Sequence, residues 1–443
     1  MTLGGLSTPH LGGGARRATA RESSACRPRG SRTPRSARSR AVQWHRGREM
    51  RAIIVAVLCG LAGVALPASA GAQTPARDVL FVGNSNDGTI DLFDAHTLTR
   101  IGGFSAIPDG NTPQDPLQAA LYEPLTSKVG INYVQDLALS PDGKTLYVSR
   151  GYLGDVAAFD LSQGGKLLWR VQTHSLRADH AELSPDGTRL FVSALTADTV
   201  EVIDTTTHQI VAEIPAGDWP HTLGFSPDGK TLWSGSLGVQ IADTATSTTP
   251  PTDGRHWLEA IDASTMLPIG TPCELGAGIR PFALTPDGSR MYVQLSYYNG
   301  VVEYDPWHCR TLRTLDLPFA GRGLTTQPHD YPNLAAQHGV AISPDGSLLC
   351  LAGTIDDDVE LVSLPSFTLS KTIAVGQDPG WAVNSPDGHY CSVSSRADPG
   401  ANSVAVVSYA TQSVVATLAT GHHPQAEITG RVPDSVLEAG GFR

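Results

Sequence analysis

Residues 137–160, "LALSPDGKTLYVSRGYLGDVAAFD", contain the pattern from which the fold of this chain can be predicted. Apolar residues alternate with polar ones around its central turn, Ser140-Pro141-Asp142-Gly143. Alternation with a period of two predicts strands rather than a helix. Pro presets φ at the second turn position, Asp suits the third, and Gly relieves the left-handed position that closes a bulged hairpin. The stretch therefore predicts short strands joined by tight turns.

This unit is repeated along the chain. The turn [ST]-P-D-G begins at Ser140, Ser184, Ser226, Thr285, Ser343 and Ser385. A second signal, a short apolar run closed by Asp or Ser, ends at Asp94, Asp160, Asp204, Asp262, Asp305, Ser363 and Ser408. Repeats of about 40–45 residues with four strands each are typical of a β-propeller. We predict an all-β fold, a seven-bladed β-propeller of four-stranded blades.

The two ends of the repeat region predict how the ring closes. Residues 79–104 supply strands two to four of a blade that lacks its first strand, whereas "HHPQAEITG" at 422–430 has no strand after it. Pairing the C-terminal strand into blade one as its innermost strand removes an open edge. We therefore place the propeller at 78–430, followed by a C-terminal tail at 431–443.

The N-terminal region differs from the repeats. Residues 1–49 are rich in Arg, Ser and Gly, which predicts a disordered basic extension or sequence upstream of the true start at Met50. Residues 50–72 combine a basic start, a short apolar run and small residues at A-x-A spacing. This pattern is typical of a signal peptide, so we expect a secreted or periplasmic protein without membrane insertion after the signal is removed.

Charge and cysteine content narrow the function classes. Residues 1–72 hold twelve of the 32 basic residues and two of the 43 acidic ones, so the mature chain would carry a formal charge of −21. Such a surface repels nucleic acid, and we expect none as a partner. Cys273 and Cys309, from adjacent blades, can form a disulfide, whereas Cys350 and Cys391 are expected to be buried and free. We further expect a monomer that acts on a small molecule.

One apparent motif is rejected. Gly224, Gly229, Lys230 and Thr231 match the spacing of a phosphate-binding loop. They lie in the repeated turn, however, and "TLWSGS" after it reads as a strand, whereas a phosphate-binding loop needs a helix there. We therefore expect no nucleotide, and no C-x-x-C-H motif indicates haem.

The repeats resemble the YVTN-type β-propeller family, to whose consensus residues 137–160 are close. The resemblance covers about residues 78–430 and implies the fold. It is weak for function, because that family includes enzymes, redox proteins and surface proteins. Similar propellers include lactone hydrolases and streptogramin lyases, whose catalysis uses His and a divalent metal at the channel mouth.

Aligning the seven innermost strands on their turns predicts a polar ring at the mouth of the channel. Five residues before the turns stand Gln135, Asp179, His221, Arg280, His338, Gly380 and Gln425. The next position holds Asp136, His180, Thr222, Pro281, Gly339, Trp381 and Ala426. Insertions at 105–134, 236–256 and 318–337 are expected on the same face, as lids. We predict one cavity there into which His180, His221, Arg280 and His338 point.

Three interpretations of this mouth remain open. The polar groups can simply satisfy one another and water in a wet channel. They can bind a divalent metal (zinc, copper, manganese or magnesium) through His180, His221, His338 and His423. Or they can perform metal-free acid/base chemistry, with His221 and His338 as catalytic groups beside Asp179 and Arg280. Arg280 would hold a substrate anion, and further substrate contacts are assigned to Gln135, Trp381, His329 and Tyr331.

Two function classes follow. The first is an exported enzyme that acts on a small polar or aromatic molecule by lactone hydrolysis or lyase-type chemistry. The second is a non-catalytic exported propeller that binds a protein or glycan through its loop face. The His/Arg/Asp ring and the long lids favour the enzyme.

Overall fold

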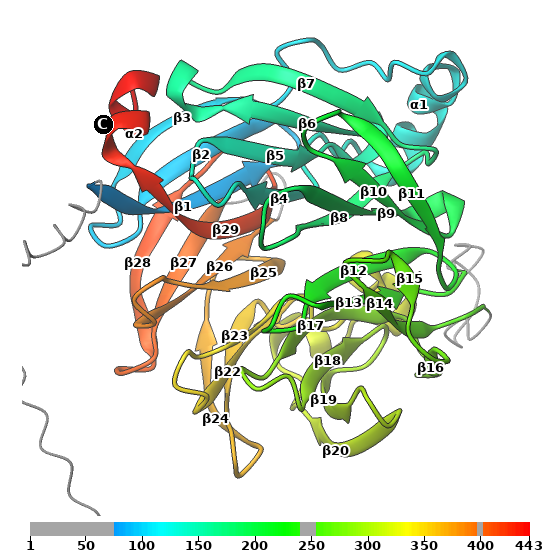
Figure 1. The fold of residues 1–443 in the computed structure, drawn as a ribbon. Coiled ribbons are helices and arrows are strands. Elements are labelled where there is room, and N and C mark those ends of the chain that lie inside the picture. Colours follow the sequence, from blue (N-terminus) through cyan, green and yellow to red (C-terminus); the bar gives the residue numbers. More distant parts are fainter. Residues whose placement is uncertain (1–74, 240–253, 397–401) are drawn as a thin grey trace, which may run out of the picture. The chain divides into compact units, whose positions relative to one another are not determined.

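The computed structural model describes residues 75–239, 254–396 and 402–443. These residues fold into seven antiparallel sheets arranged as blades around a common axis (Figure 1). Each innermost strand contacts the innermost strands of the blades on either side, which closes the ring. The predicted seven-bladed β-propeller is confirmed. The extension, the signal peptide and most of the 236–256 insertion lie outside the described residues.

The first three blades are regular four-stranded antiparallel sheets, and blade one contains the C-terminal strand that closes the ring. From the innermost strand outward, blade one is β29 (Pro424–Pro433), β1 (Ala76–Asn84), β2 (Thr89–Asp94) and β3 (Arg100–Ser105). Blade two is β4 (Asp136–Leu139), β5 (Thr145–Ser149), β6 (Asp155–Asp160) and β7 (Lys166–Gln172). Blade three is β8 (Ala178–Leu183), β9 (Arg189–Ala194), β10 (Thr199–Asp204) and β11 (Gln209–Pro215).

The other four blades follow the same order, except that the outer strand of blade four is split. Blade four is β12 (Pro220–Phe225), β13 (Thr231–Ser236) and β14 (Trp257–Asp262), which pairs with both β15 (Leu267–Pro268) and β16 (Cys273–Glu274). Blade five is β17 (Ile279–Leu284), β18 (Met291–Leu295), β19 (Gly300–Asp305) and β20 (Arg310–Asp316). Blade six is β21 (Val340–Ile342), β22 (Leu348–Gly353), β23 (Asp358–Ser363) and β24 (Thr368–Ala374). Blade seven is β25 (Pro379–Asn384), β26 (Tyr390–Ser395), β27 (Ser403–Ser408) and β28 (Ser413–Ala419).

The C-terminal strand closes the ring as the sequence predicts, and it continues further. β29 pairs with β1 from Pro424 to Pro433, past the predicted boundary at residue 430. Helix α2 (Asp434–Gly440) follows, and its Leu437 is buried in the core shared by blades one and two. The residues expected to form a tail are therefore part of the folded domain, since they cover apolar surface of the outer strands.

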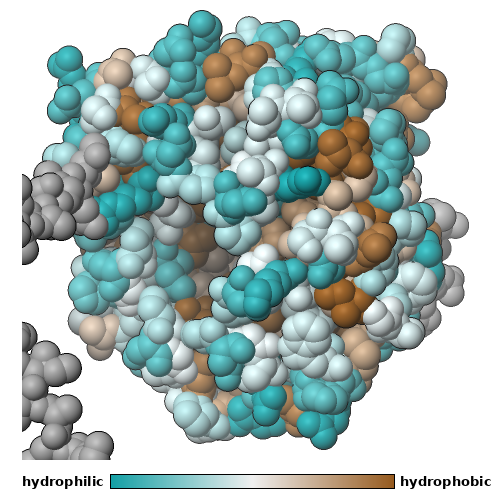
Figure 2. All heavy atoms as spheres, in the orientation of Figure 1, coloured by the Kyte–Doolittle hydropathy of each residue, from teal (hydrophilic) through white to brown (hydrophobic). Residues whose placement is uncertain are grey.

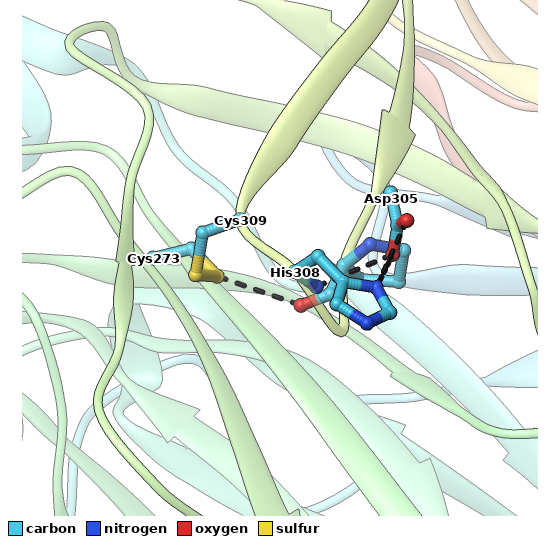
Figure 3. Close-up of a disulfide and its surroundings, with 5 residues drawn as sticks. Cys273, Asp305, His308 and Cys309 are labelled. Carbon is cyan, nitrogen blue, oxygen red and sulfur yellow. Dashed lines mark hydrogen bonds and ion pairs between the residues drawn. A yellow bond between two sulfur atoms is a disulfide. The ribbon is translucent and has the colours of Figure 1, made fainter.

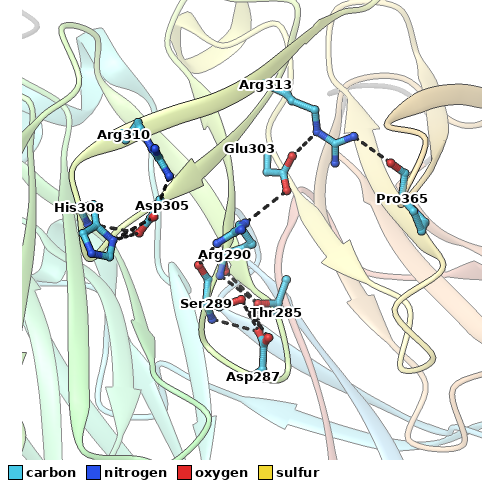
Figure 4. A network of polar contacts seen from close by, with 10 residues as sticks. All are labelled: Thr285, Asp287, Ser289, Arg290, Glu303, Asp305, His308, Arg310, Arg313 and Pro365. Carbon is cyan, nitrogen blue, oxygen red and sulfur yellow. Dashed lines mark hydrogen bonds and ion pairs between the residues drawn. The ribbon is translucent and has the colours of Figure 1, made fainter.

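The repeated turn has the predicted chemistry, which Figure 4 shows for blade five. The Thr285 hydroxyl donates to the Asp287 carboxylate (2.6 Å), and that carboxylate accepts from the Ser289 backbone N–H (3.0 Å). The Arg290 backbone N–H donates to the Thr285 hydroxyl (3.1 Å). The glycine of this turn, Gly288, has a φ of 67°. A β-carbon would strain that left-handed conformation, so the turn selects glycine.

The apolar core is divided into layers between neighbouring blades. One such layer joins Tyr147 and Val156 of blade two to Leu190 and Val192 of blade three. Equivalent clusters lie between each of the other pairs of adjacent blades. This packing buries the alternating apolar residues on both faces of each sheet and holds the innermost strands around the axis.

Two disulfides cross between blades. Cys273 on β16 bonds to Cys309 in the turn after β19, as predicted, with their Cα atoms 5.1 Å apart (Figure 3). Cys350 and Cys391 are also bonded, with their Cα atoms 6.6 Å apart, so the expectation that they are free is wrong. Both lie on the second strands of adjacent blades, β22 and β26, and the packed sheets bring equivalent positions within bonding range.

One long helix lies between blade one and blade two. Helix α1 (Pro116–Val129) lies in the 105–134 insertion between blades one and two. Its N-cap is Asp115, whose carboxylate accepts from the Gln118 backbone N–H (2.8 Å).

Among the described residues, no helix has both the length and the apolar character needed to cross a membrane.

Candidate functional site

The innermost strands line two cavities. The first, about 960 Å³, lies at the loop face and is here called the mouth cavity. The second, about 540 Å³, lies beside the repeated turns and is here called the turn-side cavity. Figure 2 shows the surface hollowed near the middle of the ring. The two cavities divide the polar residues of the channel between them.

Neighbouring ring positions face different cavities. The mouth cavity is lined by the first set of predicted positions: Gln135, Asp179, His221, Arg280, His338 and Gln425. The turn-side cavity is lined by the second set: Asp136, His180, Thr222, Pro281, Gly339 and Trp381. Successive side chains on a strand point in opposite directions, and the second position lies deeper along the axis. The prediction of one shared cavity is therefore correct for His221, Arg280 and His338 and wrong for His180.

Four aromatic rings form a layer between the two cavities. His180 stacks on Trp381 with ring centroids 4.9 Å apart and lies 4.5 Å from His221. His221 in turn lies 5.7 Å from His338, which is 6.2 Å from Trp381. Trp381, predicted to contact substrate, donates its indole N–H to the Glu427 carbonyl oxygen (3.1 Å). Trp381 therefore belongs to this layer of rings and lines the turn-side cavity.

His221 and His338 are held in their neutral forms. Burial lowers the pKa of His221 to about 3, despite the opposing effect of Asp179. Burial and the nearby Arg396 place the pKa of His338 well below its usual value. Nδ1 of His338 lies 3.0 Å from the Gly380 carbonyl oxygen, so Nδ1 carries the hydrogen and Nε2 keeps its lone pair. Both rings are thus proton acceptors or metal ligands at neutral pH.

His180 and Asp179 carry the opposite electrostatic character. Burial alone would lower the pKa of His180, but Asp136 and Asp179 outweigh it and raise the pKa. Nδ1 of His180 lies 2.9 Å from an Asp136 carboxylate oxygen, which directs Nε2 toward Asp179. Burial would raise the pKa of Asp179, but Arg177 and His221 hold it well below its usual range. Asp179 is therefore a buried carboxylate in its charged form.

Arginines surround the mouth cavity. The fully buried guanidinium of Arg280 donates from Nε to the Ser296 hydroxyl (2.9 Å). Burial, together with repulsion from Arg177 and Arg396, lowers the pKa of Arg280 to about 9. Arg177 donates to the Gln135 side-chain carbonyl (2.9 Å) and lies 3.5 Å from Asp179. The floor of the cavity is therefore cationic, although the chain as a whole is acidic.

Arg177 and Arg396 were not among the predicted site residues. Arg396 follows β26 and occupies the space beside Gly380, where a β-carbon would lie 2.0 Å from its Nε atom. The available signal was the glycine at position 380 in an otherwise polar ring. A glycine there leaves room for a side chain from the neighbouring chain segment just beyond the second strand, but only the packed blade shows which one.

A possible metal-binding group is present, but it differs from the predicted one. Asp179, His180 and His221 are buried and place one ligand atom each within 4.8 Å of the others. Among the described residues, both Asp179 oxygens, Nε2 of His180 and both ring nitrogens of His221 make no hydrogen bond, although Asp179 lies within ion-pair distance of Arg177, His180 and His221. The donor set suits a transition-metal ion. Of the four predicted histidines, His338 and His423 line the mouth cavity outside this group.

The two described insertions roof the mouth cavity, as predicted. Leu125, Val129 and Ile131 contribute from the first insertion, and Arg322 and Leu334 from the second. The predicted contacts from His329 and Tyr331 are not found at the cavity wall.

The second insertion turns sharply at two prolines. Pro328 and Pro332 each begin a short 3-10 turn, Pro328–Asp330 and Pro332–Leu334. Tyr331 between them points inward and packs with Ala336 and Ile355. The tight turns therefore direct this side chain into a small apolar cluster and away from the cavity.

Comparisons with known proteins agree on the architecture. A sequence model of the family described as "Lactonase, 7-bladed beta-propeller" matches residues 71–211. No curated protein matches the sequence. The structure is similar to a hydrazine synthase chain of Kuenenia stuttgartiensis at 18% identity, with a TM-score of 0.55, covering 79% of this chain and 99% of that one.

Two further solved structures are similar at low sequence identity. A candidate 6-phosphogluconolactonase of Bacteroides fragilis NCTC 9343 has 14% identity and a TM-score of 0.56, with 81% of this chain and 99% of that chain covered. The dihydro-haem d1 dehydrogenase NirN, in complex with DHE, has 13% identity and a TM-score of 0.51; 77% of this chain and 64% of that chain are covered. Likeness at these identities concerns the fold, and the chain is a seven-bladed β-propeller.

Proposed function

We propose that the mouth cavity is the active site of a lactone hydrolase. One observation carries the proposal: two neutral histidines, His221 and His338, face the same cavity as the buried guanidinium of Arg280. The lactonase family match over residues 71–211 and the Bacteroides fragilis neighbour support the choice of lactones as the substrate class.

The mouth residues supply what lactone hydrolysis requires. Water adds to the ring carbonyl carbon, the ring C–O bond breaks, and the products are a hydroxyl group and a carboxylic acid, which releases its proton to solvent and becomes a carboxylate. His338 accepts a proton from the water through Nε2, and the proton is passed to the leaving oxygen. Arg280 stabilises the negative charge that develops on the carbonyl oxygen. Arg177 and Arg396 extend this cationic surface toward the product carboxylate.

A divalent metal would be held by Asp179, His180 and His221. When bound, it would lower the pKa of a water molecule and so supply hydroxide at neutral pH. Asp136 would orient His180 for this role, because its carboxylate fixes the hydrogen on Nδ1. We expect about one equivalent of metal in the purified protein by elemental analysis, and its loss in the variants Asp179→Asn and His180→Gln. Metal-free protein that remains fully active in chelator would contradict this part of the proposal.

The function is tested with five- and six-membered lactones and two matched variants. We expect His338→Ala to lower kcat/KM by about 10²- to 10⁴-fold, the usual contribution of a general base. His329→Ala is the control, because this histidine belongs to the second insertion but does not line the cavity. Folded wild-type protein that hydrolyses none of these lactones would contradict the proposal and favour the non-catalytic binding module.

We also propose export through residues 50–72. The two disulfides support an oxidising compartment, where such bonds persist. Cleavage at the A-x-A sites would leave a mature chain that begins at Gly71 or Gln73. N-terminal sequencing of the exported protein checks this, and a mature protein that begins at Met1 or Met50 would contradict it.

A further inference from the structure

Helix α1 presents two different faces. Gln118 and Thr126 are buried, and the Gln118 side-chain amide donates to the Leu176 carbonyl oxygen (3.1 Å), which anchors the helix. A neighbouring face of the helix carries apolar residues that are open to solvent. Among them, Leu117 is 69% exposed and Val129 is 54% exposed. Residues adjacent in a helix sequence are separated by about 100° around its axis. Polar contacts thus hold one face, and an apolar face is left open.

The open face is a continuous stripe that ends in the mouth cavity. Its members are spaced four residues apart, which places them in one row along the helix: Leu117, Leu121, Leu125 and Val129. Leu125 and Val129 line the cavity, and so does Ile131 just beyond the helix. The outer two members, Leu117 and Leu121, are exposed. The stripe therefore leads from the molecular surface into the candidate site.

Other parts of the ring continue this apolar surface around the cavity. The connections between blades contribute Leu176, Trp219 and Leu334 to the wall. Leu195 and Leu237 join them from the loops between the second and third strands of blades three and four. The floor differs, because Asp179, His221, Arg280 and Arg396 gather there, each at most 3% exposed. One cavity thus combines a charged floor with an apolar wall that opens along α1.

We propose that the substrate is amphiphilic: its lactone ring lies on the charged floor and a hydrocarbon substituent lies along the stripe on α1. The inference rests on the proposed function, because it takes the mouth cavity as the site of hydrolysis. A cationic floor fits the carboxylate formed by ring opening, and an apolar wall fits a chain that is removed from water. The stripe continues the cavity wall, so a small-molecule tail fits it better than a second copy of the chain.

The chain-length dependence of binding and of turnover tests the proposal. Linear alkyl carboxylates of four to twelve carbons serve as product-like probes, and γ-lactones with alkyl chains of increasing length serve as substrates. We expect affinity and kcat/KM to rise about three- to fourfold per added methylene until the stripe is covered, the increment for burial of one CH₂ group. Affinity that is independent of chain length would overturn the inference.

Two matched variants locate the effect. Leu125→Ser, at the cavity wall, should flatten the dependence of affinity and of kcat/KM on chain length. Leu267→Ser is the control, because Leu267 is 62% exposed on the outer strand of blade four. If the increase in affinity per methylene is the same in Leu125→Ser as in the wild type, the inference is overturned. It is also overturned if the wild-type protein forms a dimer that Leu121→Ser does not form, because a second copy of the chain would then cover the stripe.

The outcomes separate this inference from the proposed function. Turnover of lactones without any chain-length effect would keep the hydrolase and remove the amphiphilic substrate. Chain-length-dependent binding of carboxylates without turnover of any lactone would keep the apolar subsite and remove the hydrolase.

Discussion

The chemistry of single residues in the channel is set by what lies next to them. His180 and His221 are in adjacent blades, with ring centroids 4.5 Å apart, yet their pKa values shift in opposite directions. His180 lies between two carboxylates that outweigh the effect of burial on its pKa. At His221 burial dominates and lowers the pKa, because Asp179 is opposed there by the positive charges of His180 and Arg280. Burial likewise favours the neutral form of Glu427, which lines the turn-side cavity, and raises its pKa to about 8.

The pKa of Glu427 predicts a specific pH dependence of stability. The folded state retains the proton up to pH of about 8, whereas the unfolded chain loses it near pH 4.5. The stabilisation is therefore complete below the unfolded pKa and is lost as pH rises through the folded value. Glu427→Gln should raise the melting temperature relative to wild type by at least about 2 °C at pH 8.5 and by little at pH 4.5. Thermal unfolding monitored by circular dichroism measures this difference.

The control is Glu123→Gln on an exposed face of α1. Its melting temperature should follow that of the wild type at every pH. Parallel curves for Glu427→Gln and wild type between pH 4.5 and 8.5 would show that Glu427 is ionised alike in both states.

At the scale of elements, strand β29 and helix α2 close the first blade. β29 supplies the innermost strand that the N-terminal segment lacks, so both ends of the repeat region meet in one sheet. Val436, Leu437 and Phe442 then enter the core shared by blades one and two. Helix α2 is only seven residues long, so its sequence is too short to show a clear amphipathic pattern.

Truncating the side chain of Leu437 should destabilise the protein measurably. Leu437 is fully buried, and a buried leucine replaced by alanine costs about 2–5 kcal/mol through lost burial and the cavity left behind. Urea unfolding of Leu437→Ala should therefore show a lower midpoint than wild type. Ser435→Ala, at an exposed position in the same helix, should unfold like the wild type. Equal midpoints for the two variants would mean that α2 is not docked in solution.

At the scale of the whole molecule, the ring is held by blade-to-blade contacts and by two covalent bridges. Cys273–Cys309 joins blades four and five, and Cys350–Cys391 joins blades six and seven. The bridges span 36 and 41 residues of sequence. They restrict the unfolded chain far more than the folded ring, whose blades are already in contact.

Both disulfides should be detected and both should stabilise the ring. Peptide mapping by mass spectrometry without reduction should recover the two expected pairs. The double variants Cys273→Ser/Cys309→Ser and Cys350→Ala/Cys391→Ala should each lose about 2–4 kcal/mol of unfolding free energy. Free thiols at Cys350 and Cys391 in the unreduced protein would contradict the second bridge.

Sequence patterns alone predict the architecture and most of the residues of the ring at the mouth. Strand alternation and turn chemistry are local properties that repeat with the blade, so they predict the number of blades and the positions before each turn. The unpaired first and last strands determine the closure. Gln135, Asp179, His221, Arg280, His338 and Gln425 all face the mouth cavity, as equivalent positions in equivalent blades must.

The direction in which each side chain points, and the partner it meets, depend on how the blades pack together. One step along a strand moves His180 and Trp381 to the turn-side cavity, and Gly380 leaves a space that Arg396 fills. The bond between Cys350 and Cys391 depends on how closely two blades pack. These features depend on distances between segments far apart in the chain, and a local sequence pattern contains no information on such distances.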